Sequence, residues 1–257
     1  MPEGLDGKVA LLTGATAGIG LACASGLAHA GFGRIVVVGR SEERGIAARD
    51  HLRRQSSADV RFFAADVSTP AGAQSAADTC ANLFGRIDVL VSVAGGAPMP
   101  RLMHETPIED IGRVIGSITS GVLLPARAVL PVMMTQKSGS IICIASDAAK
   151  VATPGEVTIG AAMAAIVMFC RALAIEAKRS GIRVNCVTPS IVKDTPFYDT
   201  LMADPFASKL FSKAERMASL GVVEPSDLAS LVAFLAGPDS ARLTGQTISV
   251  NGGISAA

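Results

Sequence analysis

The chain has 257 residues, within the range of one α/β domain, and 49% of them are apolar, enough for a large core. Lys and Arg (23) nearly balance Asp and Glu (22), and like charges form no block, which argues against nucleic acid or an anionic membrane surface as the main partner. The five cysteines are scattered without metal-ligand spacing, so we expect buried thiols, no metal site and a reducing, cytoplasmic setting.

The first long apolar stretch, from Val9 to Gly33, contains no Asp, Glu, Lys or Arg. Its hydropathy alone is compatible with a membrane span. However, a glycine-rich loop interrupts it, and no basic segment precedes it. We therefore predict a buried strand followed by a buried helix, and no membrane partner.

Short runs rich in Val and Ile recur along the chain, separated by segments of helical length. In chain order they are "KVALLT", "RIVVVG", "VRFFAA", "IDVLVSVAG", "SIICIAS", "IRVNCV" and "TISV". Such alternation predicts right-handed βαβ units and a parallel sheet covered on both faces. The expected fold class is α/β: one Rossmann-fold domain over residues 1–257, with a doubly wound parallel sheet of seven strands.

A glycine-rich loop, "TGATAGIG", follows the first predicted strand and opens the first helix. Glycines at these spacings let the backbone turn tightly and approach a pyrophosphate, which then lies at the positive end of the helix. No Walker lysine is present, so nucleotide hydrolysis is not indicated. The loop predicts dinucleotide binding by Gly14, Thr16, Gly18, Ile19 and Gly20.

Several further motifs occur in a fixed order, and with them the chain from about Lys8 to Gly253 resembles the short-chain dehydrogenase/reductase family. They are "ADV" at 65–67, "SVAG" at 92–95 in place of the family's "NNAG", "RVNCVTPS" at 183–190 and "ARLTGQTISVNGG" at 241–253. The resemblance implies a nicotinamide cofactor. It places Asp66 and Val67 at the adenine, Ala94 and Gly95 at the adenosine ribose, and the nicotinamide side at Pro189, Ser190, Val192 and Thr195.

The end of the second strand bears on the choice of cofactor. NAD-preferring relatives carry a carboxylate there for the ribose 2′-hydroxyl. Here Gly39 stands at that position and Arg40 follows, so repulsion of a 2′-phosphate is absent and a guanidinium is available to pair with it. The second basic residue of some NADP-binding relatives is replaced by Ala17. On balance, NADP(H) is favoured over NAD(H).

The family's catalytic tetrad is Asn, Ser, Tyr and Lys, in which a tyrosine of lowered pKa transfers the proton. Ser146 matches the serine, whereas Ile118 stands at the asparagine position. The usual Tyr-x-x-x-Lys register gives Ile159 and Met163, and the spacing of the enoyl-reductase branch gives Glu156 and Met163. The helix presents an apolar stripe, which we interpret as a catalytic helix repacked as core: Ile159, Ala162, Met163, Ile166, Val167, Cys170 and Leu173.

Other residues near the expected site offer substitutes for the missing groups. Asp147, Lys150, Glu156 and His104 are candidates, although each also fits a solvated loop or a helix cap. The only tyrosine, Tyr198, belongs to a segment (about 193–222) that the resemblance makes a substrate lid. The Phe and Met residues of this lid indicate an apolar small-molecule ligand.

Two functions remain open. The first is a pseudoenzyme, a cofactor-binding or formerly cofactor-binding subunit that stabilises or regulates a homo-oligomer or a hetero-oligomer with an active paralogue. The second is an active NADPH-dependent oxidoreductase with non-standard residues, reducing an activated C=C bond or a carbonyl of an apolar substrate. The apolar segments "VLLPARAVLPVMM" and "IGAAMAAIVMFCRALAI" favour an oligomer, because in the family these helices form a four-helix interface.

Overall fold

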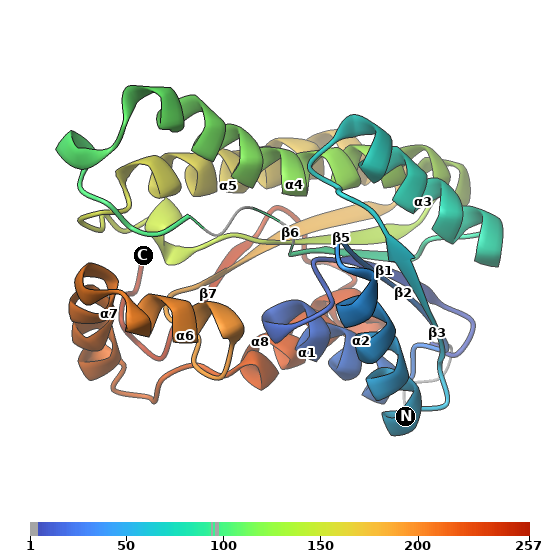
Figure 1. Ribbon diagram of the computed structural model, residues 1–257. Coiled ribbons are helices and arrows are strands. Elements are labelled where there is room, and N and C mark those ends of the chain that lie inside the picture. The colour runs from blue at the N-terminus through green and yellow to red at the C-terminus, as the bar shows by residue number, and fades with distance from the viewer. Residues whose placement is uncertain (1–4, 94, 96–97) are drawn as a thin grey trace.

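A computed structural model describes residues 5–93, 95 and 98–257 as a parallel sheet between two layers of helices (Figure 1). The seven strands pair in the order β3-β2-β1-β4-β5-β6-β7, and each pair is parallel. Their bounds are β1 Val9–Thr13, β2 Arg34–Gly39, β3 Asp59–Ala64, β4 Val89–Ser92, β5 Gly139–Ile144, β6 Ile182–Pro189 and β7 Thr247–Val250. The predicted doubly wound seven-stranded fold is therefore confirmed.

One strand is much shorter than predicted. The apolar run 87–95 forms a strand only over Val89–Ser92. In the register of the sheet, Ser92 lies opposite Thr13, the last residue of β1, so the next residues have little strand left to pair with on that side. The chain consequently leaves the sheet after Ser92, at the edge where the carboxyl ends of the strands meet.

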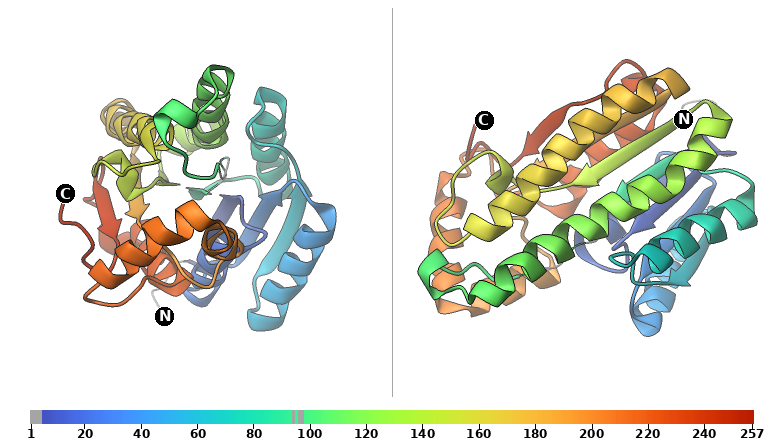
Figure 2. Two further views of the ribbon diagram at one scale, coloured as in Figure 1. Left: turned by 60° about the vertical axis from the view of Figure 1, so that its left-hand side comes forward. Right: turned by 90° about the horizontal axis from the view of Figure 1, so that it is seen from above.

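Helices cover both faces of the sheet, and the right-hand view of Figure 2 shows α3, α4 and α5 running side by side over one of them. This layer consists of α3 Pro70–Phe84, α4 Ile108–Gln136 and α5 Val157–Ala177. The opposite layer consists of α1 Gly18–His29, α2 Glu42–Gln55 and α8 Pro225–Ala236. Two shorter helices, α6 Pro196–Ala203 and α7 Pro205–Met217, lie beyond the carboxyl ends of the strands (Figure 1). The 3₁₀ turns are η1 Met103–Glu105, η2 Asp147–Ala149, η3 Lys178–Ser180 and η4 Pro238–Ser240.

The apolar segments singled out in the sequence lie in the core. All five residues of β1 are buried, and so are all five cysteines. In α5 the predicted stripe packs against the sheet, with Met163 only partly buried at its amino-terminal end. The buried members of the stripe are Ile159, Ala162, Ile166, Val167, Cys170 and Leu173. This face of α5 therefore serves as core, as its spacing predicts.

Two helices have the length and apolar composition of a membrane span, namely Ile108–Gln136 and Val157–Ser180. Core helices of globular proteins pass the same test. In this structure both helices lie against the sheet, and α4 also packs on α5.

A buried carboxylate joins the amino ends of β1 and β4. Asp88 is 7% exposed and accepts hydrogen bonds from Arg86 (Nε to Oδ2, 2.7 Å; Nη2 to Oδ1, 2.6 Å), from Lys8 Nζ (3.0 Å) and from the backbone N–H of Val9 (3.0 Å). Burial alone would raise the pKa of Asp88, but these donors outweigh it and lower the pKa. The carboxylate thus fixes the edge of the sheet opposite to the strands' carboxyl ends.

We expect Asp88→Ala to lower the free energy of unfolding by about 2–4 kcal/mol, because it leaves the positive charges and a buried N–H without their acceptor. Asp59→Ala is the matched control. It removes a carboxylate that also pairs with a nearby Arg61 but is 41% exposed, and we expect it to cost less than about 1 kcal/mol. Urea denaturation at pH 7 measures both free energies of unfolding, and equal losses would contradict the role of Asp88.

Because the pKa of Asp88 is lowered in the folded protein, the carboxylate contributes to the free energy of unfolding at neutral pH. This contribution is lost as the pH falls below the ordinary pKa range of an aspartate.

Candidate functional site

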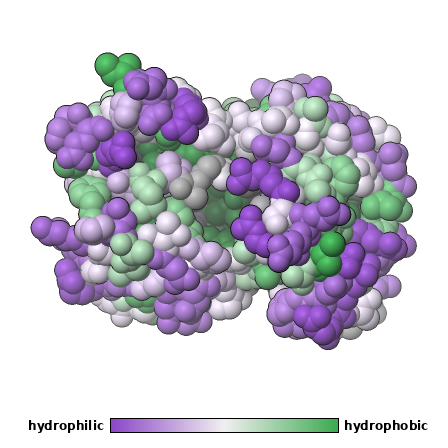
Figure 3. Space-filling model, viewed as in Figure 1, coloured by the Kyte–Doolittle hydropathy of each residue, from purple (hydrophilic) through white to green (hydrophobic). Residues whose placement is uncertain are grey.

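A cavity of about 560 Å³ opens at the carboxyl ends of the strands. Its walls come from the β1–α1 loop, the ends of β4, β5 and β6, the start of α5, and the helices α6 and α7. Figure 3 shows this face hollowed near its centre, with mainly apolar residues inside the hollow. In doubly wound sheets this edge is where ligands bind.

The glycine loop fits a pyrophosphate. Gly14 and Gly18 have positive φ angles of 66° and 51°. A Cβ on Gly20 would collide with the carbonyl oxygen of Gly14, so only glycine allows α1 to start so close to β1. Ala17, the N-cap residue of α1, supplies no side-chain hydrogen bond, and no acidic residue lies in the first turn. The first N–H groups of α1 are thus left for an anionic ligand.

Residues at the ends of β2 and β3 surround the position expected for the cofactor's adenosine ribose. A Cβ on Gly39 would lie 2.6 Å from Cγ2 of Thr16, so a side chain at residue 39 would require the half-buried Thr16 side chain to move. Arg40 is exposed and its charge reaches Asp66, where it contributes to a lowered pKa. The larger cause of that lowered pKa is hydrogen bonding from Ser68, whose Oγ lies 2.6 Å from Asp66 Oδ1.

The structure brings most of the predicted cofactor residues together. Those that line the cavity are Gly14, Gly18, Ile19, Gly20, Gly95, Pro189, Ser190, Val192 and Thr195. Thr16, Arg40, Asp66 and Val67 are not among the lining residues, although they too follow the carboxyl ends of β1, β2 and β3. Ala94 lies outside the described residues.

Ser146 lies on the wall of the cavity, just after β5. It is the N-cap of η2, and its Oγ accepts a hydrogen bond from the backbone N–H of Ala148 at 3.2 Å. Because a hydroxyl both accepts and donates, this bond leaves its hydrogen free to donate to a ligand. The predicted catalytic serine is thus placed to contact a bound molecule.

Three apolar residues face the same cavity. Ile118, Ile159 and Met163 all line it, and the first two are 1% and 8% exposed. Among the described residues that line the cavity, Tyr198 is the only tyrosine and Lys213 the only lysine, and both come from the segment 193–222. The wall formed by α4 and α5 therefore offers no phenol or ammonium.

Asp147 lines the cavity, but its carboxylate and the ammonium of Lys150 are engaged by other protein groups. The carboxylate of Asp147, 5% exposed, accepts hydrogen bonds from Ser249 Oγ (3.0 Å), Ser255 Oγ (2.9 Å) and the amide of Asn251. Lys150 Nζ bonds to Ser249 and lies 3.5 Å from Asp147 Oδ1. These groups hold residues 249–255 against the Ser146 loop, which is a structural task.

Two other candidate proton donors, Tyr198 and His104, also have partners outside the expected reaction site. The hydroxyl of Tyr198 donates to Glu215 Oε1 at 2.7 Å, and this bond is the main cause of its raised pKa, opposite to what a catalytic tyrosine needs. His104 is 75% exposed, pairs with Glu105 at 3.8 Å and is not among the residues that line the cavity. In this arrangement neither side chain offers a free proton donor to a molecule in the cavity.

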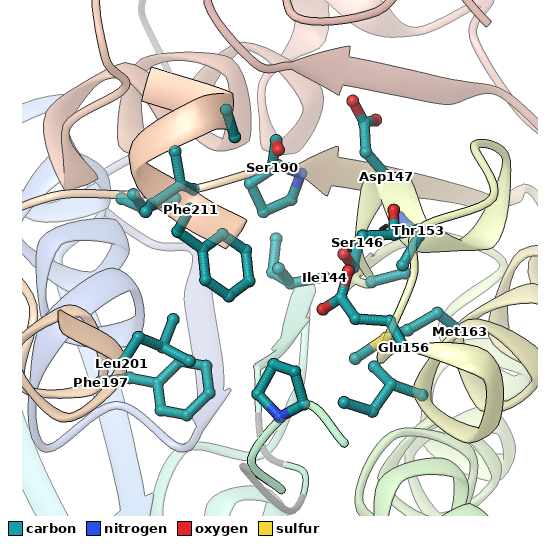
Figure 4. Close-up of a pocket in the computed structure, with 18 of the residues that line it drawn as sticks. Ile144, Ser146, Asp147, Thr153, Glu156, Met163, Ser190, Phe197, Leu201 and Phe211 are labelled. Carbon is teal, nitrogen blue, oxygen red and sulfur yellow. Dashed lines mark hydrogen bonds between the residues drawn. The ribbon is translucent and has the colours of Figure 1, made fainter. Parts of the chain in front are cut away.

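Glu156 remains, and its side chain points into the cavity near Ser146 and Met163 (Figure 4). It is the N-cap residue of α5, but its side chain makes no capping bond. Burial raises the pKa of its carboxyl to about 7, against a smaller opposing effect of a hydrogen bond from Thr153. The enoyl-reductase spacing was the sequence signal for this residue. Its orientation into the cavity, which distinguishes it from Asp147, Lys150 and His104, is visible only in three dimensions.

The segment 193–222 forms the remaining wall through α6 and α7. Two contacts join the two ends of this segment. They are a parallel β-bridge between Val192 and Val223 and an ion pair between Lys193 Nζ and Glu224 Oε1 at 2.8 Å. Its inner side is apolar, with Phe197, Leu201, Leu210, Phe211, Ala214 and Met217 lining the cavity. The expected role as a substrate lid stays a prediction, and the apolar lining agrees with it.

Comparisons with known proteins agree on the family. Residues 14–255 match the family model described as "Enoyl-(Acyl carrier protein) reductase". D-threitol dehydrogenase of Mycolicibacterium smegmatis is 35% identical over 257 residues, covering 97% of this chain and 93% of the relative. A 3-oxoacyl-[acyl-carrier-protein] reductase of Vibrio cholerae is 31% identical over 256 residues, covering 97% and 98%.

A solved structure of 3-ketoacyl-(acyl-carrier-protein) reductase from Brucella melitensis, complexed with NADH, superposes with a TM-score of 0.87 at 29% identity. It covers 98% of this chain and all of the other. With the fold, the glycine loop and the ligand edge in place, these matches establish that the chain belongs to the short-chain dehydrogenase/reductase family.

Proposed function

We propose that this protein binds NADP(H) at the carboxyl edge of its sheet and is catalytically silent in the family's ordinary ketone and alcohol chemistry. The observation that carries the proposal is the apolar wall made by Ile118, Ile159 and Met163 beside Ser146. When bound, the cofactor supplies hydride to, or accepts it from, a neighbouring carbon. The glycine loop and the N-terminus of α1 would hold its pyrophosphate, and Ser146 would donate a hydrogen bond to a ligand oxygen.

A second candidate is the reduction of an activated C=C bond in an apolar substrate. It is favoured by Glu156, whose carboxyl shares the cavity with Ser146 at the tyrosine position of the enoyl-reductase spacing. Addition of hydride to such a bond yields an enolate, whose charge is spread and can be stabilised by hydrogen-bond donors. The match to a family model described as an enoyl reductase also supports this candidate.

The preference for NADP(H) rests on two features. Residue 39 is a glycine, so no carboxylate stands at the position where NAD-preferring relatives hold the ribose, and Arg40 is exposed beside it. A guanidinium suits a 2′-phosphate because it can donate two parallel hydrogen bonds.

We expect NADPH to bind more tightly than NADH, and Arg40→Ala to reduce the difference by about 1–2 kcal/mol, roughly 5–30-fold in the ratio of dissociation constants. Cofactor fluorescence titration measures both affinities. Arg54→Ala, an exposed arginine at the end of α2, is the matched control and should leave the ratio unchanged. Equal affinities for the two cofactors in wild type would contradict the assignment of Arg40.

For simple ketones, aldehydes and secondary alcohols we expect negligible turnover, because acid–base assistance contributes about 10²–10⁴-fold and its usual donor is absent. The triple variant Ile118→Asn, Ile159→Tyr, Met163→Lys should gain measurable ketone reduction, followed as loss of NADPH absorbance. Adding Ser146→Ala to it should abolish the gain.

Ser146-dependent ketone reduction by the wild type would refute the silent assignment. Reduction of enoyl thioesters alone would select the second candidate.

We also propose an oligomer, either of this chain alone or with an active paralogue, joined through α4 and α5. Met134, Val157, Met168 and Ile175 are large apolar side chains on these helices that are 49–63% exposed. Exposed apolar side chains distributed along two packed helices are expected at an interface between subunits.

Light scattering at micromolar concentration should report a dimer or larger species, and Met168→Glu should shift it toward the monomer. Leu83→Glu is the control, because Leu83 is also a large exposed apolar residue but lies on α3. It should leave the size of the oligomer unchanged. A monomeric wild type would count against the oligomer.

A further inference from the structure

The ionisable side chains that line the cavity, among the described residues, are Asp147, Glu156, Tyr198 and Lys213. Asp147 is saturated by Ser249, Asn251 and Ser255, and Tyr198 already donates to its partner on α7. Lys213 is exposed on α7, at the rim. Only the carboxyl of Glu156 therefore combines burial with a position in which it can turn its oxygens toward a ligand.

This half-buried carboxyl lies near Ser146, Thr153 and Met163 (Figure 4). The α4 and α5 residues that line the same cavity are apolar: Ile118, Val122, Ile159, Met163 and Ile166. The charged groups around the cavity are the Asp147–Lys150 pair on η2, Lys213 and the Tyr198–Glu215 pair on the opposite wall, and the exposed Arg101, whose backbone N–H bonds to Gly155. No cation stands against it among the cavity-lining residues of α4 and α5, so the neutral form of the acid is favoured.

The backbone fixes the start of the α5 helix that carries this side chain. Gly155 has a φ of 82°, and a Cβ there would lie 2.6 Å from the ring of Phe206. Its carbonyl oxygen accepts a hydrogen bond from the backbone N–H of Arg101 at 2.8 Å. Glu156 is thus presented from a tight turn held by two other segments, and not from a freely solvated loop.

We propose that Glu156 is the cavity's proton donor: as a protonated acid it donates a hydrogen bond to the carbonyl oxygen of an uncharged, mainly apolar ligand that Ser146 also contacts. The inference rests on the proposed function in that the cavity is the ligand site. Two donors then converge on one oxygen, which a carboxylate at residue 156 could not provide because it only accepts. Next to Ser146 and Glu156 an anionic ligand group is disfavoured, since no buried cation stands there among the described cavity-lining residues; the N–H groups of α1 that suit an anion lie at the glycine loop.

The Glu156 proton would also be used in the second candidate function, the reduction of a C=C bond. During reduction of an activated C=C bond, for which the bound cofactor would supply the hydride at the β-carbon, the Glu156 carboxyl would give its proton to the α-carbon of the resulting enolate. The resulting carboxylate regains a proton from water at the mouth of the cavity. One hydride and one proton are consumed for each double bond reduced, and no further co-reactant is needed.

The first test is the protonation state itself, which needs neither cofactor nor turnover. Infrared difference spectra between pH 5 and pH 9 should show a protonated carboxyl band in wild type that disappears with a midpoint near 7. The band should be missing in Glu156→Gln and retained in Glu43→Gln, an exposed carboxylate on α2. A midpoint in the ordinary carboxyl range, or a band that survives in Glu156→Gln, overturns the inference; the wild-type titration alone is decisive if the variant fails to fold.

The second test is ligand binding in the presence of NADP⁺, measured by calorimetry. The uncharged thioester 2-octenoyl-N-acetylcysteamine should bind wild type at pH 6 and at least tenfold more weakly at pH 8.5, whereas octanoate should bind poorly at both. In Glu156→Gln the affinity for the thioester should be independent of pH, because the amide keeps a donor. Failure of wild type to bind the thioester, or pH dependence that persists in Glu156→Gln, overturns the proposed ligand class.

Cofactor titration separates this inference from the proposed function. Wild type and Glu156→Gln should bind NADPH equally, since Glu156 is not part of the glycine loop. Loss of NADPH binding in both, with the infrared titration intact, refutes the proposed cofactor site and leaves the protonated acid in place. Normal NADPH binding without a titrating carboxyl refutes the role of Glu156 alone.

Discussion

The turn from β1 into α1 depends on a contact that only glycine permits. Because Gly20 has no side chain, α1 begins directly against the carbonyl of Gly14. That approach aims the N–H groups of α1 at the edge where the carboxyl ends of β1, β4, β5 and β6 meet. The cavity, the Ser146 loop and the start of α5 are arranged around this point, so a bulkier residue at position 20 would displace the site as a whole and not merely weaken one contact.

The chemistry of the cavity follows from how little charge it contains. An apolar wall along α4 and α5 removes the groups that would stabilise an oxyanion by charge. The same wall partly shields the half-buried Glu156 carboxyl from water and raises its pKa to about 7, so that its protonated and ionised forms are both populated at neutral pH. The low charge of the cavity wall and the altered acidity of Glu156 are thus two aspects of one low-dielectric environment.

The fold could be predicted almost completely from the sequence, because strand and helix periods are local and the glycine loop has a single geometric explanation. The seven strands lie where Val- and Ile-rich runs predict them, apart from β4, whose length is limited by the end of its neighbour β1. The site could be predicted only in part. Asp147 and Glu156 are both carboxylates on loops near Ser146 in the sequence, yet one is bonded to residues about a hundred positions away and the other is not. Long-range partners of this kind leave no trace in local pattern.

The bonds from Asp147 to Ser249, Asn251 and Ser255 have a consequence for the order in which the protein becomes functional. A ribosome delivers the chain from its amino end, and the glycine loop, Ser146 and α5 are all synthesised well before residue 249. Until that last stretch arrives, the Asp147 carboxylate beside the serine lacks its hydrogen-bond partners and the cavity lacks the wall that Ile254 and Ser255 supply. A nascent chain can therefore form most of its sheet while still being unable to shape its binding site, which is completed in a single late step.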